Sequence, residues 1–256
     1  MTLKQRQPQR YGYIPDLPDH RDLVFRPRNR AVPTKLDLRD TGFLNFPIYD
    51  QGNLGSCTAN AIAAAIRFAE LKEQKEAPDA QGPLPNGPSR LAIYWWERWI
   101  EGSVQTDSGA MIRDGLKAVA TDGFYDEKHW PYDISRFTQT PPPATAVDVI
   151  QKAAKYKRVG QSWKSLRSAL ASGFPVVVGF TVYSSFGADT PMPGKNDRVE
   201  GGHAVLLVAY DDATRRFTCR NSWGAGWGHS GYFTIPYGYL GSSALAGDYW
   251  LIQTEA

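Results

Sequence analysis

Hydrophobic residues follow two different patterns along this chain. In the first half they recur at helical spacing, as at Ala59, Ile62 and Ala69, which predicts a helix over residues 58–74. Similar segments predict further helices at 89–101, with Ser89 as N-cap, at 109–121 and at 162–172. Beyond these segments, β-branched and aromatic runs are separated by turn residues. They predict strands at 175–183, 203–211, 215–223, 231–237 and 248–253.

The order of these elements indicates the fold class. Helices followed by a block of strands are typical of an α+β protein with two segregated lobes and a cleft between them. We expect a helical lobe over about 34–145 and a strand-rich lobe over about 146–256. A Pro/Gly loop covers 76–88, and the proline-rich segment at 140–143 is the predicted crossover between the lobes.

Residues 1–33 form a different kind of segment. They are rich in Pro, Arg and Asp, which predicts an extended N-terminal arm rather than a helix. A purely solvated tail rarely carries many apolar side chains, so we expect part of this arm to pack on the body. The apolar side chains of the arm are Tyr11, Tyr13, Ile14, Leu17, Val24 and Phe25.

Composition and charge exclude several classes of protein. The length of 256 residues suits one large domain or two lobes that share a core. The formal charge of +3 is too small to imply a nucleic-acid partner, and the basic character is concentrated in the arm. The longest apolar run, at 175–183, is far shorter than the ~20 residues of a membrane helix. We therefore expect neither a nucleic-acid nor a membrane partner.

Cysteine content and the N-terminal residues leave the compartment open. Two cysteines permit at most one disulfide, so the chain is not a disulfide-stapled domain. The opening MTLKQRQPQR has no apolar core of the kind that a signal peptide needs. A cytoplasmic location and export by a dedicated secretion route both fit these observations.

Cys57 is the first candidate for chemistry. It lies where the polar loop YDQGNLGS meets the predicted helix at 58–74. Unpaired backbone N–H groups and the helix dipole stabilise an anion at such a position, which predicts a lowered thiol pKa and a reactive thiolate. The alternative is a small buried side chain that only packs.

A thiolate needs a proton partner, and histidine is the usual one. His203 follows two glycines and precedes the apolar strand AVLLVAY, so it lies at the mouth of a buried strand. The other histidines, His20, His129 and His229, lie in the arm or in turns and are most simply surface residues. His203 is therefore the candidate partner, with a structural histidine as the alternative.

The segment CRNSWGAGWGHSGYFTIP suggests a third participant. Strand alternation places Cys219 and Asn221 on one face, although asparagine is disfavoured in strands. An asparagine carbonyl that accepts a hydrogen bond from an imidazole N–H would explain its presence. Trp223 and Trp227 are placed to shield that bond from water. The alternative is a Gly/Trp turn with an exposed asparagine.

Four separated motifs together resemble the papain family of cysteine peptidases, and the resemblance covers about residues 34–256. The motifs are QGNLGSC, DSGAMIRDG, GGHAVLLVAYD and NSWGAGWGHSGYFTI. The resemblance implies a two-lobed α+β fold, with a helical left lobe, an antiparallel, barrel-like β lobe on the right and the active site in the cleft. It implies no metal or other cofactor.

The resemblance also implies roles for individual residues. Cys57 resembles the nucleophile, His203 the acid/base partner and Asn221 the residue that orients the imidazole. Gln51 resembles the side-chain donor of the oxyanion hole, which the Cys57 backbone N–H completes.

Substrate-binding positions follow from the same resemblance. Ser108 and Gly109 match the segment that pairs with the substrate backbone. Met111, Gly179 and Ala204 match the pocket for the second residue before the scissile bond. We expect that pocket to be apolar and to prefer a bulky hydrophobic side chain. Trp223 and Trp227 are also predicted to belong to the substrate-binding set.

The chain departs from the family pattern at two positions near the nucleophile. Thr58 replaces the usual aromatic residue after it, and Leu54 replaces the cysteine that usually forms a disulfide, so Cys219 is expected to be unpaired. We also expect no long helical propeptide of the kind found in the plant and lysosomal members. Instead, the arm motif YGYIPDLPDHRD resembles compact bacterial-type members of the family, the Xylella enzyme among them.

These observations predict a thiol-dependent endopeptidase that acts as a monomer on peptides or proteins. A non-catalytic papain-fold binding or regulatory protein is the alternative from another class, and an exopeptidase, amidase or ligase is the alternative within the chemistry. The arm is predicted either to restrain activity by covering the cleft, as in a zymogen, or only to strap the lobes together.

Overall fold

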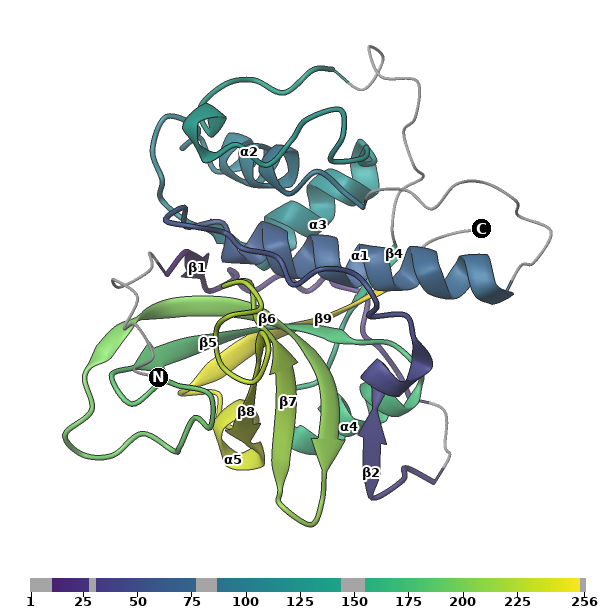
Figure 1. Cartoon of the computed structure of the whole chain (residues 1–256). Helices are drawn as coiled ribbons and strands as arrows, with labels where there is room; N and C mark the ends of the chain where they lie inside the picture. Colours follow the sequence, from purple (N-terminus) through teal and green to yellow (C-terminus); the bar gives the residue numbers. More distant parts are fainter. Residues whose placement is uncertain (1–10, 28–30, 77–86, 144–154, 254–256) are drawn as a thin grey trace.

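The computed structural model divides into a helical layer and a β-sheet layer, with the first helix between them (Figure 1). It describes residues 11–27, 31–76, 87–143 and 155–253. The helices of the first half are α1, Cys57–Glu76, α2, Arg90–Ile100, and α3, Ile112–Thr121. Helix α1 packs against α2 and α3 on one side and against β6 of the sheet on the other. The arrangement is the expected α+β class with two lobes.

Within the described residues, the sheet has seven antiparallel strands, in the order β4-β9-β5-β6-β7-β8 with β2 added beside β6. The strands are β2 Lys35–Asp37, β4 Lys155–Arg158, β5 Val176–Tyr183, β6 Val199–Asp211, β7 Arg216–Arg220, β8 Tyr232–Pro236 and β9 Ala246–Gln253. The five strands predicted from β-branched and aromatic runs correspond to β5 to β9. The central positions of β5, β6 and β9 are buried, which explains the apolar runs from which these strands were predicted.

Helix boundaries agree with the sequence pattern except at α3. Ser89 caps α2, since its hydroxyl accepts a hydrogen bond from the Ala92 N–H. Helix α4, Trp163–Ala171, lies within the predicted 162–172 and is capped by Ser162. Helix α3 begins at Ile112 rather than at 109 because the two preceding residues form the short strand β3, Ala110–Met111.

Several short elements were not predicted from the sequence. Strand β2 pairs with β6, so its three residues belong to the sheet, although the sequence placed them in the helical lobe. Strand β4 reads KYKR and lacks an apolar alternation, and α5, Tyr237–Gly241, is a single turn. The predicted loop at 76–88 lies mostly outside the described residues. The chain at 140–143 is irregular, but the remainder of the crossover also lies outside the described residues.

The N-terminal arm runs between the two lobes. Its strand β1, Tyr13–Ile14, pairs in parallel with β3 and contacts β6. Further along, the Phe25 N–H donates to the Arg158 carbonyl and the Arg158 N–H donates to the Leu23 carbonyl. The arm therefore contacts the body at both lobes.

Among the described residues, no helix is long and apolar enough to cross a membrane.

Arg98 fixes the loop that leads from α2 to β3. Its side chain is fully buried and donates to the carbonyls of Val104 and Thr106 in that loop and to the Phe137 carbonyl. A guanidinium has five donors in a planar fork, which suits it to several carbonyls at once. Arg98 thereby positions the segment 107–111, which pairs with the N-terminal arm.

We predict that Arg98→Met lowers the free energy of unfolding by about 3 kcal/mol, because it removes a buried guanidinium that donates to the carbonyls of Val104, Thr106 and Phe137. Denaturant unfolding measures the change. Arg21→Met is the matched control, since the Arg21 side chain is 88% exposed and its loss is expected to change stability by less than about 0.5 kcal/mol. Equal stabilities of the two variants would contradict the assigned role of Arg98.

Candidate active site

The site is built around Cys57, the first residue of α1. The loop before it is held from two sides, since the Gln51 N–H donates to the Ser222 carbonyl at 2.8 Å and the Gly55 N–H donates to the Asp107 carboxylate at 2.9 Å. These contacts fix where the loop ends and the helix begins. The Cys57 side chain is 0% exposed, and its thiol lies against the backbone of Ala204 on β6.

His203 lies on β6 next to Ala204 and is hydrogen-bonded to Asn221, which directly follows β7. The distance from His203 Nε2 to Asn221 Oδ1 is 2.8 Å. Strands β6 and β7 are paired neighbours in the sheet, so the two side chains come together although 18 residues separate them. The sequence prediction of an imidazole–asparagine bond therefore agrees with the geometry.

The orientation of Asn221 determines which imidazole nitrogen carries the proton. The Ser222 backbone N–H donates to the same Asn221 Oδ1 at 2.9 Å, so this atom must be the carbonyl oxygen. An oxygen that only accepts requires His203 Nε2 to be the donor. In the neutral ring, Nδ1 is then the unprotonated nitrogen. This Nδ1 is buried and has no hydrogen-bond partner among the described residues.

Aromatic rings enclose the His203–Asn221 pair. Trp223 stacks on the imidazole, with ring centroids 4.9 Å apart, and Trp227 meets Trp223 edge-on. Phe180 and Phe186 contact the imidazole from other sides. These rings exclude water from the His203–Asn221 bond, which is the arrangement expected from the Gly/Trp motif.

Gln51 is held with its amide oriented. Its Oε1 accepts a hydrogen bond from the Ser222 hydroxyl at 2.7 Å, and its Nε2 donates to the Leu54 carbonyl at 2.8 Å. The Tyr132 hydroxyl donates to the Gln51 carbonyl. The side chain is completely buried just before the start of α1. Leu54, which replaces the usual family cysteine, thus contributes a backbone acceptor that fixes Gln51.

The N-terminal arm covers this site. Gly12 packs so closely on Gly55 that a Cβ atom on Gly12 would lie 1.7 Å from the Gly55 carbonyl oxygen. The Gly12 carbonyl accepts from the Ala110 N–H at 2.7 Å, and the Gly12 backbone contacts the Cys57 thiol. Tyr11 lies edge-on to the His203 ring at 6.0 Å. The thiol and the imidazole are therefore sealed beneath the arm.

Burial sets the protonation of the pair. It raises the pKa of the Cys57 thiol to about 12, against the opposing effect of backbone contacts from Ala204, Gly12 and Thr58. It also lowers the pKa of His203 to about 4, although the Asn221 hydrogen bond opposes this shift. At neutral pH the covered site thus holds a thiol and a neutral imidazole. The lowered thiol pKa expected from the helix terminus is wrong for this closed form, because burial outweighs the dipole.

Several of the residues predicted to bind substrate line the path of the arm. Gly109 directly precedes β3, and Met111 pairs with Ile14 of the arm. Gly179 and Ala204 are cross-strand partners on β5 and β6. Ser108 differs, because its exposed hydroxyl bonds to the Ser103 hydroxyl and the Gly109 carbonyl rather than to the arm.

Three groups near the site were missed by sequence reasoning. Ser222 orients Gln51, and its signal was its place within the NSW motif. Tyr94 accepts a hydrogen bond from the Gly109 N–H. Glu97 is fully buried and accepts from the Thr58 hydroxyl at 2.8 Å, so the residue that replaces the usual aromatic has a specific polar partner. Burial raises the pKa of Glu97 well above its ordinary value.

Both cysteines are free, as expected for Cys219. In the described part of the chain, no group of three or more His, Cys, Asp or Glu side chains is arranged to hold a metal ion.

Comparisons with known proteins place the chain among cysteine peptidases. A family model described as papain family cysteine protease matches residues 102–249. An uncharacterized peptidase C1-like protein of Acanthamoeba polyphaga mimivirus is 38% identical, over 95% of this chain and 86% of that protein. A cathepsin B-like protein, CP3, of Giardia intestinalis is 42% identical over 84% of this chain and 74% of its own length.

Solved structures agree with the sequence matches. Xylellain, a cysteine protease from Xylella fastidiosa, is 42% identical, with a TM-score of 0.84 and full coverage of both chains. Procathepsin L 3 of Tenebrio molitor has a TM-score of 0.68 at 17% identity, covers 91% of this chain and 73% of its own, and supports the fold alone. The predicted papain-like fold and the resemblance to the Xylella enzyme are both confirmed.

The cover over Cys57 can be tested by alkylation. We predict that Gly12→Ala, whose Cβ cannot fit against Gly55, raises the rate at which iodoacetamide modifies Cys57 at pH 7.5 by at least about tenfold, because an exposed thiolate is the reactive species. Peptide mapping distinguishes Cys57 from Cys219.

Gly187→Ala is the matched control, because a Cβ atom at Gly187 meets nothing within 4 Å. In this variant, iodoacetamide is expected to modify Cys57 as slowly as in the unaltered chain. Rapid alkylation of Cys57 in the unaltered chain would contradict the closed site.

Proposed function

The chain belongs to the papain family of cysteine proteases and is a cysteine-type peptidase, and from this premise we propose that it is an endopeptidase with Cys57 as nucleophile. The observation that carries the proposal is the hydrogen bond between His203 Nε2 and Asn221 Oδ1, which leaves the buried Nδ1 as the proton acceptor. Its substrates are peptides or proteins. All the proposed catalytic groups come from one chain, which supports a monomer as the functional unit.

In the proposed mechanism, His203 Nδ1 takes the proton of the Cys57 thiol, and the thiolate adds to the peptide carbonyl carbon. The imidazolium, held by Asn221, then gives this proton to the leaving amine as the C–N bond breaks. Water, deprotonated by His203, attacks the resulting thioester. As the C–S bond breaks, His203 passes the proton taken from water to the Cys57 sulfur, and the product leaves as a carboxylic acid that releases its own proton to solvent.

The oxyanion formed in both steps needs two donors. We assign these to the Cys57 backbone N–H and to the Gln51 side chain. The bonds from Ser222 to Gln51 Oε1 and from Gln51 Nε2 to Leu54 orient the amide and leave the second Nε2 hydrogen for the oxyanion. A donor fixed before the reaction needs no reorganisation in the transition state.

We propose further that the arm is an autoinhibitory segment rather than only a strap. Support comes from its position, since Gly12 contacts the thiol itself and pairs with Ala110 beside the proposed substrate track. A strap that joined the lobes elsewhere would not need this contact. The arm also keeps the thiol and imidazole neutral, whereas the reaction needs a thiolate and an imidazolium.

The endopeptidase assignment is tested with the Gly12→Ala chain. We predict that it hydrolyses internal bonds of an unstructured protein substrate and is labelled by an epoxide inhibitor of thiol peptidases, and that adding Cys57→Ala abolishes both. Asn221→Ala in the same background is expected to lower kcat/KM by about 10–100-fold, because the imidazole loses its orientation. Labelling that persists without Cys57 would exclude it as the nucleophile.

Docking of the arm is expected to depend on pH through Asp16. Burial, with the nearby Asp248 charge, raises the pKa of Asp16 from 3.8 to about 6. Its contribution to docking is therefore fully present below pH 3.8 and is lost as the pH rises through about 6. Docking should weaken by about tenfold between pH 5 and pH 7.5.

The measurement is the hydrolysis rate of the unaltered chain divided by that of Gly12→Ala at each pH, which cancels the intrinsic pH dependence of catalysis. We predict that this ratio rises from pH 5 to pH 7.5. Asp16→Asn removes the titrating group and should make the ratio flat. A ratio that falls with pH, or one that Asp16→Asn does not alter, would exclude Asp16 as the controlling group.

A further inference from the structure

The arm inserts Tyr13 into a pocket beside the catalytic pair. The ring lies on the backbone of Gly179, where an added Cβ atom would be 2.2 Å from the ring carbon Cζ. A Cβ atom added to Gly202 would likewise lie 2.2 Å from the Tyr13 carbonyl oxygen. Gly247 on β9 borders the hydroxyl end. The walls are thus flat glycine backbones that accept an aromatic ring, and the pocket contains Gly179 from the predicted specificity site.

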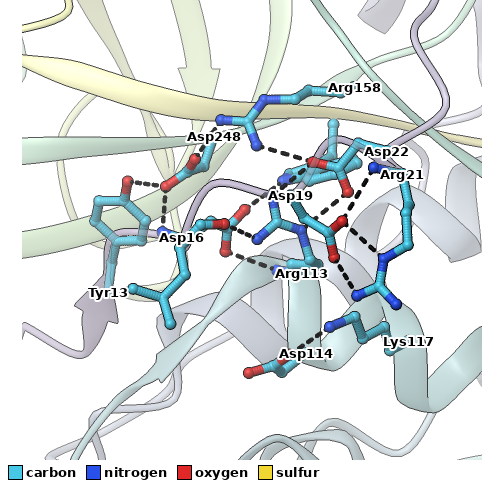
Figure 2. A network of polar contacts seen from close by, with 12 residues as sticks. Tyr13, Asp16, Asp19, Arg21, Asp22, Arg113, Asp114, Lys117, Arg158 and Asp248 are labelled. Carbon is cyan, nitrogen blue, oxygen red and sulfur yellow. Dashed lines mark hydrogen bonds and ion pairs between the residues drawn. The ribbon is translucent and has the colours of Figure 1, made fainter.

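The far end of this pocket is polar. The Tyr13 hydroxyl donates to Asp248 Oδ2 at 2.6 Å, as Figure 2 shows. Asp248 is 5% exposed and has a φ of +56°, in the left-handed region that non-glycine residues seldom adopt. Strained backbone of this kind is concentrated at functional sites. The sequence predicted an apolar pocket. The structure adds a buried carboxylate, Asp248, at its far end.

The charge of Asp248 is already balanced by the body of the protein. Arg158 on β4 donates to Asp248 Oδ1 at 2.8 Å, while Oδ2 accepts from the Tyr13 hydroxyl and from the Asp16 N–H. Both Oδ2 donors belong to the arm. When the arm leaves, Oδ2 loses its partners, but Oδ1 keeps its ion pair.

A second arginine adds positive charge to these surroundings. In the docked form Asp22 of the arm pairs with both Arg113 and Arg158 (Figure 2). Departure of the arm removes Asp22 and leaves both guanidiniums near the pocket. A substrate lysine or arginine would meet the Asp248 carboxylate, whose charge Arg158 already neutralises, together with the positive charges of Arg113 and Arg158. A neutral tyrosine hydroxyl would instead donate to Asp248 Oδ2, which then has no other donor.

We propose that Asp248 makes this pocket selective for tyrosine in the substrate, in preference to phenylalanine and to lysine or arginine. The proposal rests on the proposed endopeptidase function and names a substrate feature for it. Phenylalanine fills the same walls but leaves the buried Oδ2 without a donor, which is unfavourable. The arm holds the pocket closed with the same side chain that the open pocket selects.

The test uses the full-length Gly12→Ala chain and three peptides that differ only at the second residue before the scissile bond, which is Tyr, Phe or Lys. A hydrogen bond to a carboxylate predicts a kcat/KM about 10–100 times higher for Tyr than for Phe, with Lys below both. Ratios within one preparation do not depend on how much of the enzyme is active.

Two variants in this background assign the selectivity. Asp248→Gly tolerates the left-handed backbone but removes the acceptor, so the Tyr/Phe ratio should fall to about 1. Ser230→Gly is its control, because Ser230 is exposed and has a φ of +55°, and it should keep the original ratio. Arg158→Met removes the compensating charge and should raise the Lys/Phe ratio by about tenfold or more.

Failure of the inference differs from failure of the proposed function. Hydrolysis with Phe equal to or better than Tyr, a Tyr preference that survives Asp248→Gly, or a preference for Lys before Arg158 is replaced would each overturn the tyrosine assignment while leaving the peptidase intact. No hydrolysis of any peptide, together with no labelling of Cys57, would overturn the proposed function and this inference with it.

Discussion

The close contact of the Gly12 and Gly55 backbones is the constraint on which the closed site depends. Only a residue without a side chain fits at Gly12, and from there the arm reaches both the Cys57 thiol and the Ala110 N–H. The same approach inserts Tyr13 into its pocket and brings Tyr11 to His203. A single small residue thus determines whether the arm can lie along the cleft.

The Gly12–Gly55 contact affects the Cys57 thiol and the His203 imidazole because it buries both groups. The thiol and the imidazole are the intended ion pair of this family, yet beneath the arm their pKa values shift in opposite directions and both groups become neutral. Proton transfer between the two groups does not change the number of protons they hold together, so this pair by itself gives the proposed docking of the arm no pH dependence. The pH dependence proposed for docking of the arm comes instead from Asp16, whose pKa is raised by burial and by the nearby Asp248 charge.

Much of the fold could be predicted because its main elements carry periodic apolar residues. Helices α1 and α2 and strands β5 to β9 were predicted from the sequence, whereas β1 to β4 have two to four residues each and pair with segments distant in the sequence. In the site, Cys57, His203 and Asn221 were indicated by motif chemistry. Asp248 was not, since its role depends on β9 lying beside β5 and on where the arm places Tyr13.

The central claim, that the arm keeps the catalytic pair neutral, is tested most directly by an NMR titration of the His203 imidazole. In the unaltered chain the ring should stay neutral from pH 5 to pH 8, as its pKa of about 4 requires. In Gly12→Ala it should be protonated over this range as the partner of the thiolate. Identical titrations in the two chains would contradict the account.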